Sequence, residues 1–335
     1  MITTFTANPS LDRTIELGSV LVRGGVQRAV AAGAQAAGKG VNVSRGLAAA
    51  GIPTVAVLPG DPTDPVVVGL GVDGLPHQAL PIGQPLRSNV TLTEPDGTTT
   101  KVNEPGPVLD ALHMEQIGAA LLRTAAESSW LVLAGSLPPG VPPAFYAQMI
   151  GRLHAALGSK CPLIAVDTSE APLAALYDSP ARLPDLIKPN AEELAGLAGT
   201  CSEAELESSP ELAAAAARRL VDRGTTAVLA TLGARGAVLV TAQGAWLATH
   251  APVQARSTVG AGDSSLAGYL IAHHRGGTPS DCLISAVAYG AAAASLPGSL
   301  IPTPDQTSPA SVTVRPLRPA PLGHPVASSS QNPKE

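Results

Sequence analysis

The chain is poor in aromatic residues and in cysteine, and these absences exclude several classes of protein. Phe, Trp and Tyr together make up 2% of the 335 residues, so a core must be built mainly from Ala, Val and Leu. The three cysteines lie far apart and form no CxxC pair, which argues against zinc sites and disulfide frameworks. The adjacent His273 and His274 do not share a helix face, so we expect no metal site there.

Clusters of positive charge are also missing. The formal net charge is −5, and no basic run is longer than Arg218–Arg219. Nucleic-acid surfaces need clustered Lys and Arg, often with stacking aromatics, so we expect no nucleic-acid partner. No signal segment opens the chain, and no apolar run approaches the ~20 residues of a membrane span. The sequence therefore predicts a cytoplasmic protein without a membrane partner.

Aliphatic runs and helical patterns are plentiful instead, with 45% hydrophobic residues. Between about residues 125 and 300, short apolar runs alternate with helix-like segments, which indicates an α/β fold with a mostly parallel sheet flanked by helices. Ligands of such sheets bind beyond the carboxyl ends of the strands, where "AGS", "DTS", "KPN", "TLG" and "VGAGD" all fall. The expected strands are 130–136, 162–169, 185–190 and 226–233.

The first hundred residues and the last thirty have different patterns. Residues 13–35 and 87–104 alternate polar and apolar positions around turn signals, which predicts a small antiparallel sheet, separate from the core, that acts as a lid. Residues 59–76 are too broken by Gly and Pro for a long helix. We expect one domain over residues 1–306 and a largely disordered Pro/Ser-rich tail over 307–335.

The stretch "STVGAGDSSLAGYL", residues 257–270, ends a strand in a flexible turn and sets Asp263 at the start of a helix. Two interpretations fit these residues. Asp263 could cap the helix, as Asp often does. Alternatively, the first helix amides could hold an anion while Asp263 acts on a group beside it. The stretch by itself leaves both open.

Five motifs, taken together, resemble the PfkB (ribokinase-like) family of sugar kinases. They occur in the family's order, and the resemblance runs from residue 8 to about residue 304. It implies a ribokinase-like fold. The motifs are "NPSLD" (8–12), "AAGKGVNVSRGLAAAG" (36–51), "GSLPPG" (135–140), "KPNAEEL" (188–194) and "STVGAGDS" (257–264).

The resemblance makes Asp263 the general base that removes the proton of a sugar hydroxyl. Gly260, Ala261 and Gly262 would form an anion hole, because backbone N–H groups at a helix N-terminus favour negative charge. Phosphoryl transfer needs these parts: positioned reactants, neutralised charge and a base. With the five motifs present, the catalytic interpretation of Asp263 is favoured over simple capping.

On the sugar side, the resemblance assigns Asp12 to sugar hydroxyls and the "GKGVN" residues to the sugar phosphate. Arg87 is the leading phosphate ligand because Arg binds phosphate bidentately. Alternative interpretations are a turn carboxylate for Asp12, a solvated lysine for Lys39 and a tight turn at Ser136. Arg23 and Arg28 could contribute across a dimer, although surface solvation is the simpler interpretation. The expected substrate residues are Asp12, Gly38, Lys39, Gly40, Asn42, Arg87, Lys101 and Ser136.

On the nucleotide side, Asn190 and Glu193 match the family's N-x-x-E element, which organises Mg²⁺ through water. Magnesium needs few protein ligands, although the same pair could simply cap a helix. The region around Ser295 offers little polar chemistry for an adenine ring, so we expect weak discrimination among nucleotides. The expected ATP-binding residues are Lys188, Asn190, Glu193, Thr231, Gly233, Gly236 and Gly262.

The motifs are most similar to the phosphosugar branch of the family, and within it to fructose-1-phosphate kinases. This implies ATP- and Mg²⁺-dependent phosphorylation of fructose 1-phosphate to fructose 1,6-bisphosphate by a homodimer joined through the lid. The alternatives are a tagatose-6-phosphate or fructose-6-phosphate kinase and, from another class, a non-catalytic sugar-phosphate sensor. No GxGxxG follows the first strand, which argues against a dinucleotide-binding dehydrogenase.

Overall fold

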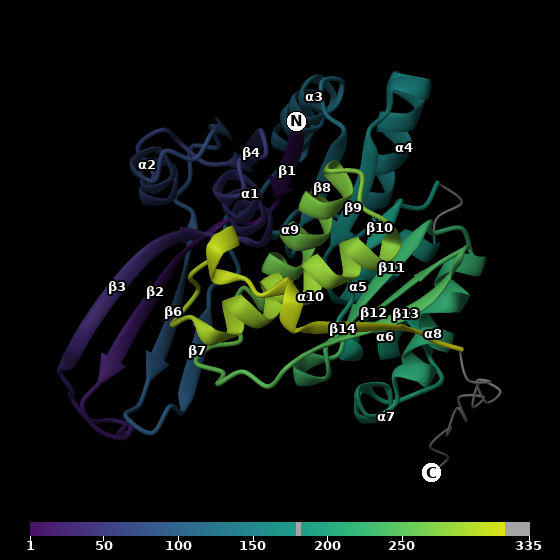
Figure 1. The fold of residues 1–335 in the computed structure, drawn as a ribbon. Coiled ribbons are helices and arrows are strands. Elements are labelled where there is room, and N and C mark those ends of the chain that lie inside the picture. Colours follow the sequence, from purple (N-terminus) through teal and green to yellow (C-terminus); the bar gives the residue numbers. More distant parts are fainter. Residues whose placement is uncertain (179–181, 319–335) are drawn as a thin grey trace, which may run out of the picture.

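The computed structural model describes residues 1–178 and 182–318, and a ten-stranded sheet forms its centre (Figure 1). Its strands from β11 to β5 are parallel, and β12, β13 and β14 continue one edge in antiparallel fashion. In spatial order the strands are β14 (Val312–Pro316), β13 (Gly244–His250), β12 (Ala237–Thr241), β11 (Ala227–Thr231), β10 (Leu186–Ile187), β9 (Leu163–Asp167), β8 (Trp130–Ala134), β1 (Ile2–Thr6), β4 (Thr54–Pro59) and β5 (His77–Leu80).

Helices cover both faces of this sheet, which is why its central strands β8 and β9 are almost continuously apolar rather than alternating. In β9, Ile164 and Val166 pack into the core on one face, and Ala165 packs into the core on the other. The four strands expected between residues 130 and 233 are all present. The first face is covered by α3 (Ala111–Ala125), α4 (Phe145–Leu157), α5 (Glu170–Asp178), α6 (Ala191–Ala198), α7 (Glu203–Ser208) and α8 (Pro210–Asp222), and the second by α1 (Lys39–Ala49), α9 (Ala261–His274) and α10 (Pro279–Ser295).

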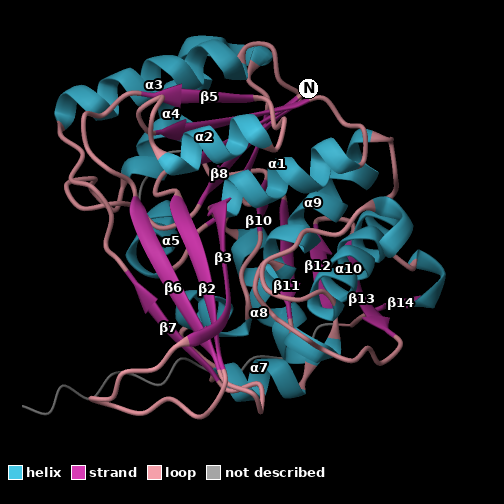
Figure 2. Ribbon diagram, turned by 90° about the vertical axis from the view of Figure 1, so that its left-hand side faces the viewer, coloured by secondary structure: helices cyan, strands magenta, loops and turns pink. Residues whose placement is uncertain are grey.

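A separate four-stranded sheet, the lid, projects from the main body (Figure 2). Its order is β3 (Ala29–Ala37), β2 (Ser10–Leu17), β6 (Arg87–Thr93) and β7 (Thr99–Asn103). The pairs β2–β3 and β6–β7 are antiparallel as expected, and the parallel pairing of β2 with β6 joins them.

Arg45 of α1 ties the lid to the main body. One guanidinium nitrogen donates to the carbonyl of Ala36 at the end of β3, and the other pairs with Asp73 at 2.6 Å. Asp73 follows α2 (Pro65–Val72), an eight-residue helix. The expectation that residues 59–76 hold no long helix is therefore confirmed.

The ordered fold continues to Leu317, past residue 306, where the sequence predicts that the kinase domain ends. Strand β14 pairs with β13, its Val312 and Val314 pack against the second core, and Leu317 is buried in the first. Pro and Ser dominate the composition here and mask this short alternation of valines. The disorder expected beyond Arg318 concerns residues outside those described.

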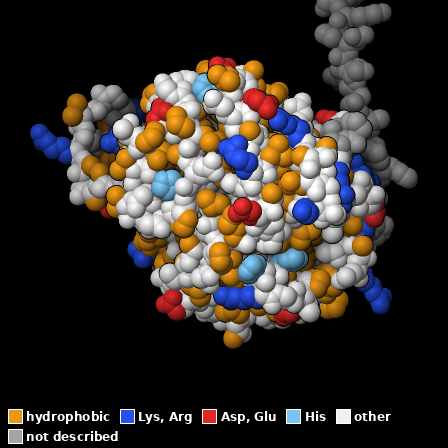
Figure 3. Space-filling view, turned by 90° about the horizontal axis from the view of Figure 1, so that it is seen from above, with side chains coloured by type: hydrophobic (Ala, Val, Ile, Leu, Met, Phe, Trp, Pro, Cys, Tyr) orange, Lys and Arg blue, Asp and Glu red, His pale blue; other side chains and the backbone are white. Residues whose placement is uncertain are grey.

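Charged side chains of both signs are interspersed on the face shown in Figure 3. This agrees with the lack of basic runs in the sequence. Among the described residues, no helix combines the length and apolar character that crossing a membrane requires.

Candidate active site

The N-terminus of α9 faces a pocket in the structure. Gly260 precedes the helix in the left-handed conformation, with φ of 76°, and no side chain caps the helix. The N–H groups of Gly262 and Asp263 have no hydrogen-bond partner in residues 1–178 and 182–318. Free amides and the helix dipole together favour a bound anion, although the amide of Ala261 donates to the Thr258 carbonyl at 3.4 Å.

Asp263 does not cap α9, so the capping interpretation of its stretch does not describe the structure. It is the third residue of the helix, and its carboxylate accepts a hydrogen bond of 2.8 Å from Nδ2 of Asn42 on α1. The ammonium of Lys39 lies 3.8 Å away. Asp263 is 6% exposed, and burial raises its pKa although Lys39 opposes the rise. A buried, oriented carboxylate with a raised pKa suits a general base.

Asp167, at the end of β9, is a site residue that the sequence analysis did not assign. It is fully buried, and its two oxygens lie 3.1 Å from Lys39 Nζ and 3.3 Å from Lys188 Nζ. Burial opposes its ionisation, yet the two ammonium groups hold its pKa below the usual value. Asp167 in turn raises the pKa of Lys39. The four charged groups form one compact cluster: Lys39, Asp167, Lys188 and Asp263.

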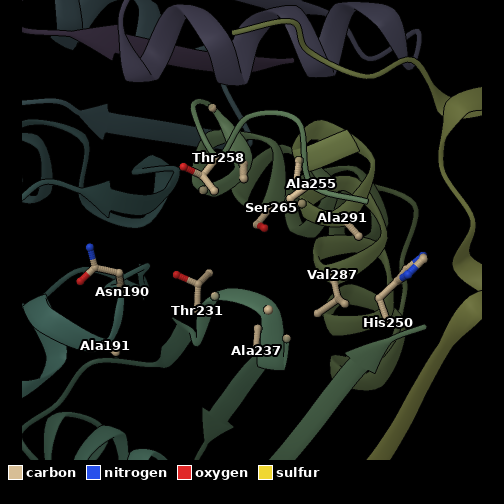
Figure 4. Close-up of a pocket in the computed structure, with 18 of the residues that line it drawn as sticks. Asn190, Ala191, Thr231, Ala237, His250, Ala255, Thr258, Ser265, Val287 and Ala291 are labelled. Carbon is tan, nitrogen blue, oxygen red and sulfur yellow. The ribbon is translucent and has the colours of Figure 1, made fainter. Parts of the chain in front are cut away.

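A pocket of about 950 Å³ extends from this cluster. Most of its lining comes from the start of α6, the turn between β11 and β12, the segment after β13, and helices α9 and α10. Figure 4 shows Asn190, Thr231 and Ala237 on one wall, with Thr258, Ser265 and Ala291 on the opposite wall. Every expected nucleotide-side residue lines it, together with Lys39 from the expected sugar side and the residues of the expected base and anion hole. These are Lys39, Lys188, Asn190, Glu193, Thr231, Gly233, Gly236, Gly260, Ala261, Gly262 and Asp263.

Asn190 and Glu193 form a reciprocal capping box at the start of α6. Oδ1 of Asn190 accepts from the Glu193 amide at 2.7 Å, and one Glu193 oxygen accepts from the Asn190 amide at 2.9 Å. The capping interpretation therefore describes their hydrogen bonds. Both residues also line the pocket, and Glu193 keeps its second carboxylate oxygen for a ligand. No cluster of three or more His, Cys, Asp or Glu side chains suited to a metal ion occurs in the described part of the chain.

Two of the expected sugar residues of the lid, Asp12 and Arg87, lie near the start of the neighbouring strands β2 and β6. Asp12 accepts hydrogen bonds from the Ser10 hydroxyl at 2.7 Å and from Asn89 Nδ2 at 3.0 Å. Arg87 donates to the carbonyl of Glu104 at 3.2 Å, and its Nε is buried without a partner among the described residues. Burial lowers the pKa of Arg87, and nearby Asp12 opposes this. Asn89 belongs to the "RSN" stretch but was not assigned from the sequence.

Other expected residues have different surroundings. The glycines of "GKGVN" let α1 approach β1 closely: a Cβ on Gly38 would lie 2.5 Å from Thr6, and one on Gly40 2.8 Å from the Phe5 carbonyl oxygen. Ser136 is exposed just after β8, and Lys101 is exposed on the edge strand of the lid. Arg23 and Arg28 are exposed in the turn between β2 and β3.

Residues 6–306 match the pfkB family of carbohydrate kinases. The chain is 33% identical over 273 residues to the 1-phosphofructokinase of Escherichia coli K12, covering 80% of this chain and 83% of that protein. It resembles the structure of Escherichia coli phosphofructokinase-2 with potassium, with a TM-score of 0.80, 27% identity, and coverage of 91% and 96%. A ribokinase of Thermotoga maritima shares the fold, with a TM-score of 0.69, 18% identity, and coverage of 91% and 97%.

Proposed function

Because the chain belongs to the pfkB family of carbohydrate kinases, we propose that this sugar kinase transfers the γ-phosphoryl group of ATP to the 6-hydroxyl of fructose 1-phosphate. The product is fructose 1,6-bisphosphate. The observation that carries the chemistry is Asp263, buried beside the free amides of α9 and the lysine–aspartate cluster. The relative named 1-phosphofructokinase supports the choice of sugar.

In this mechanism Asp263 takes the proton of the 6-hydroxyl as its oxygen attacks the γ-phosphorus. The bond from the γ-phosphorus to the bridging oxygen breaks, and ADP leaves. Charge on the transferring group is stabilised by the amides of Gly262 and Asp263 and by Lys188, whose Nζ lies 3.1 Å from where a Gly262 Cβ would be. Preorganised donors of this kind supply much of enzymatic rate acceleration.

Lys39 belongs to the reacting end of the site in this proposal. The family resemblance assigned it to the sugar phosphate, but its ammonium lies between Asp167 and Asp263. Lys39 on one side of Asp167 and Lys188 on the other would face the transferring group from the sugar and nucleotide sides. Two aspartates balance the two lysines before substrates bind.

Mg²⁺ fits the residues at the nucleotide end. When bound, the ion neutralises the phosphate oxygens of ATP. Glu193 would hold the ion through water at the pocket wall, and Asn190 orients its carboxylate through the capping box. One carboxylate suffices, because Mg²⁺ bound to nucleotides keeps several waters.

Selection of the sugar would fall to the lid. Arg87, with its buried unpartnered Nε, is the proposed ligand of the 1-phosphate. Asp12 and Asn89 would hold sugar hydroxyls, with Ser10 fixing the Asp12 carboxylate. A phosphate fixed at this end sets which hydroxyl reaches Asp263.

The lid also supports a homodimer. Strand alternation puts Ile15, Val90 and Val102 on the face opposite Asp12 and Asn89, and Val102 is 57% exposed. Exposed apolar strands need cover, and we propose a second copy of the chain. Sedimentation at micromolar concentration should give a dimer; a fully active monomer would contradict it.

The experiment that tests the function measures kcat/KM with ATP for fructose 1-phosphate, fructose 6-phosphate, tagatose 6-phosphate and fructose, with the product identified by NMR. We expect fructose 1-phosphate to be preferred. A higher value for fructose 6-phosphate would favour the second candidate, which the structural similarity to phosphofructokinase-2 supports. Absence of turnover with all four would favour a sensor.

A further inference from the structure

Two carboxylates line the pocket in addition to those of Asp263 and Glu193. Glu203 and Glu207 lie four residues apart on α7, on one face of the helix, and both line the pocket. Glu207 is the more buried of the two. A carboxylate repels a phosphate that no cation bridges, so these side chains suit a neutral, hydrogen-bond-donating part of a ligand.

Glu207 stands beside the turn that follows β11. Its Oε1 lies 3.6 Å from where a Cβ on Gly233 would be, and Arg235 fastens the same turn to α7 by donating to the Ser208 carbonyl at 3.2 Å. The turn starts just after Thr231, which faces the pocket beside Asn190 (Figure 4). Glu207 is therefore fixed to the stretch of wall that follows the phosphate-side residues.

The remaining end of the pocket is apolar. Val253 and, from α10, Val287 and Ala291 line it. His250 lies at this end in Figure 4, and its Nδ1 is engaged with the Ala251 carbonyl oxygen at 2.6 Å. This surface suits a flat base held by packing. Between a phosphate end and a base end, the part of a nucleotide that remains is its ribose.

We infer that Glu207 accepts hydrogen bonds from the ribose hydroxyls and makes the pocket selective for ribonucleotides over deoxynucleotides. A carboxylate can accept from both hydroxyls of the vicinal diol, and charge-assisted hydrogen bonds are the stronger kind. The negative charge of Glu207 also disfavours a reversed nucleotide with its phosphates at this end. The inference rests on the proposed function, because it takes the pocket to hold ATP.

Calorimetric binding of ADP, 2′-deoxy-ADP and 3′-deoxy-ADP, each with Mg²⁺ and without sugar, tests this inference. We expect the wild type to bind ADP about 10- to 100-fold more tightly than either deoxy analogue, the range expected for a hydrogen bond to a charged group. In Glu207→Ala the affinity for ADP should exceed the affinity for either deoxy analogue by no more than about threefold. Glu207→Gln keeps an acceptor without the charge and should fall between them.

Glu192→Ala is the matched control, because it removes the same charge as Glu207→Ala. Glu192 is exposed on α6 and does not line the pocket. This variant should keep the wild-type ratio. Equal binding of all three nucleotides by the wild type, or an unchanged ratio in Glu207→Ala, would overturn the inference. If Glu207→Ala fails to fold, Glu207→Gln and the wild-type ratio decide. Selective binding of ADP without turnover of any phosphosugar would reject the proposed function but leave this inference standing.

Discussion

The charge cluster at the N-terminus of α9 and the polar side chains of the lid both contain aspartates, but these aspartates are buried to different degrees. Asp167 and Asp263 are 0% and 6% exposed, held by strands and helices packed on both faces of the large sheet. Asp12 and Asn89 are only half-buried, on a four-stranded sheet that projects from the body. The proposed transfer end is thus fixed by packing, whereas the proposed sugar end lies on a small sheet outside the main body. The comparison suggests that chemistry and substrate choice can be disrupted separately.

The largest expected effect comes from Asp263→Asn. Turnover should fall about 10²- to 10⁴-fold, the usual contribution of a positioned general base. Nucleotide binding and folding should remain close to wild type, because the amide oxygen can still accept from Asn42. Steady-state kinetics, calorimetric ADP binding and thermal unfolding measure the three properties. Wild-type turnover would remove Asp263 from the mechanism.

Asp167→Asn in the charge cluster should lower the free energy of unfolding more than a substitution of an aspartate on the lid. It leaves the Lys188 ammonium without its buried carboxylate and Lys39 with Asp263 alone, and breaking a buried ion pair costs about 3–5 kcal/mol. Because Lys39 is partly exposed, we expect the lower end, about 3 kcal/mol, from urea unfolding.

Asp12→Asn on the lid is the control for this measurement. It disturbs hydrogen bonds from Ser10 and Asn89 and should cost only about 1 kcal/mol. Equal losses in the two variants would contradict the contrast between a packed transfer end and an open lid.

Arg87→Ala should change sugar selection without changing the transfer chemistry. Losing the proposed phosphate ligand should reduce the preference for fructose 1-phosphate over fructose about 10- to 100-fold. Turnover of bound substrate should change less. Lys101→Ala, at an exposed position on edge strand β7 of the lid, should have a smaller effect. An unchanged preference in Arg87→Ala would reject Arg87 as the anchor.

The pH dependence of kcat and that of stability should give the smallest effect. The two dependences should distinguish Asp263 from Asp167. Asp263 must be ionised to act, and burial raises its pKa, so kcat should decline on acidification above the ordinary Asp range near pH 4. Asp167 has a lowered pKa, so its contribution to stability is present above that range and is lost only as pH falls through the lowered value. A kcat constant down to pH 4 would contradict the raised pKa of Asp263.

The sequence by itself predicted the elements that depend on local pattern. Continuous aliphatic runs identified strands β8 to β11, alternation identified the lid, and "VGAGD" identified a free helix N-terminus with its carboxylate. Such features follow from hydrophobic period and turn chemistry. The short strand β14 was missed because its two valines lie among Pro and Ser.

Only the tertiary structure decided which side chains meet. Lys39 and Asp167 are 128 residues apart, and Asn42 and Asp263 are 221 apart, so no local pattern relates them. Asp167 ends an apolar strand, as many polar residues do, and only the parallel order of β8, β9 and β10 brings it beside Lys188 and the start of α1. Charges can be buried this way only when their partners arrive from other elements, because an unpaired charge would not be tolerated there.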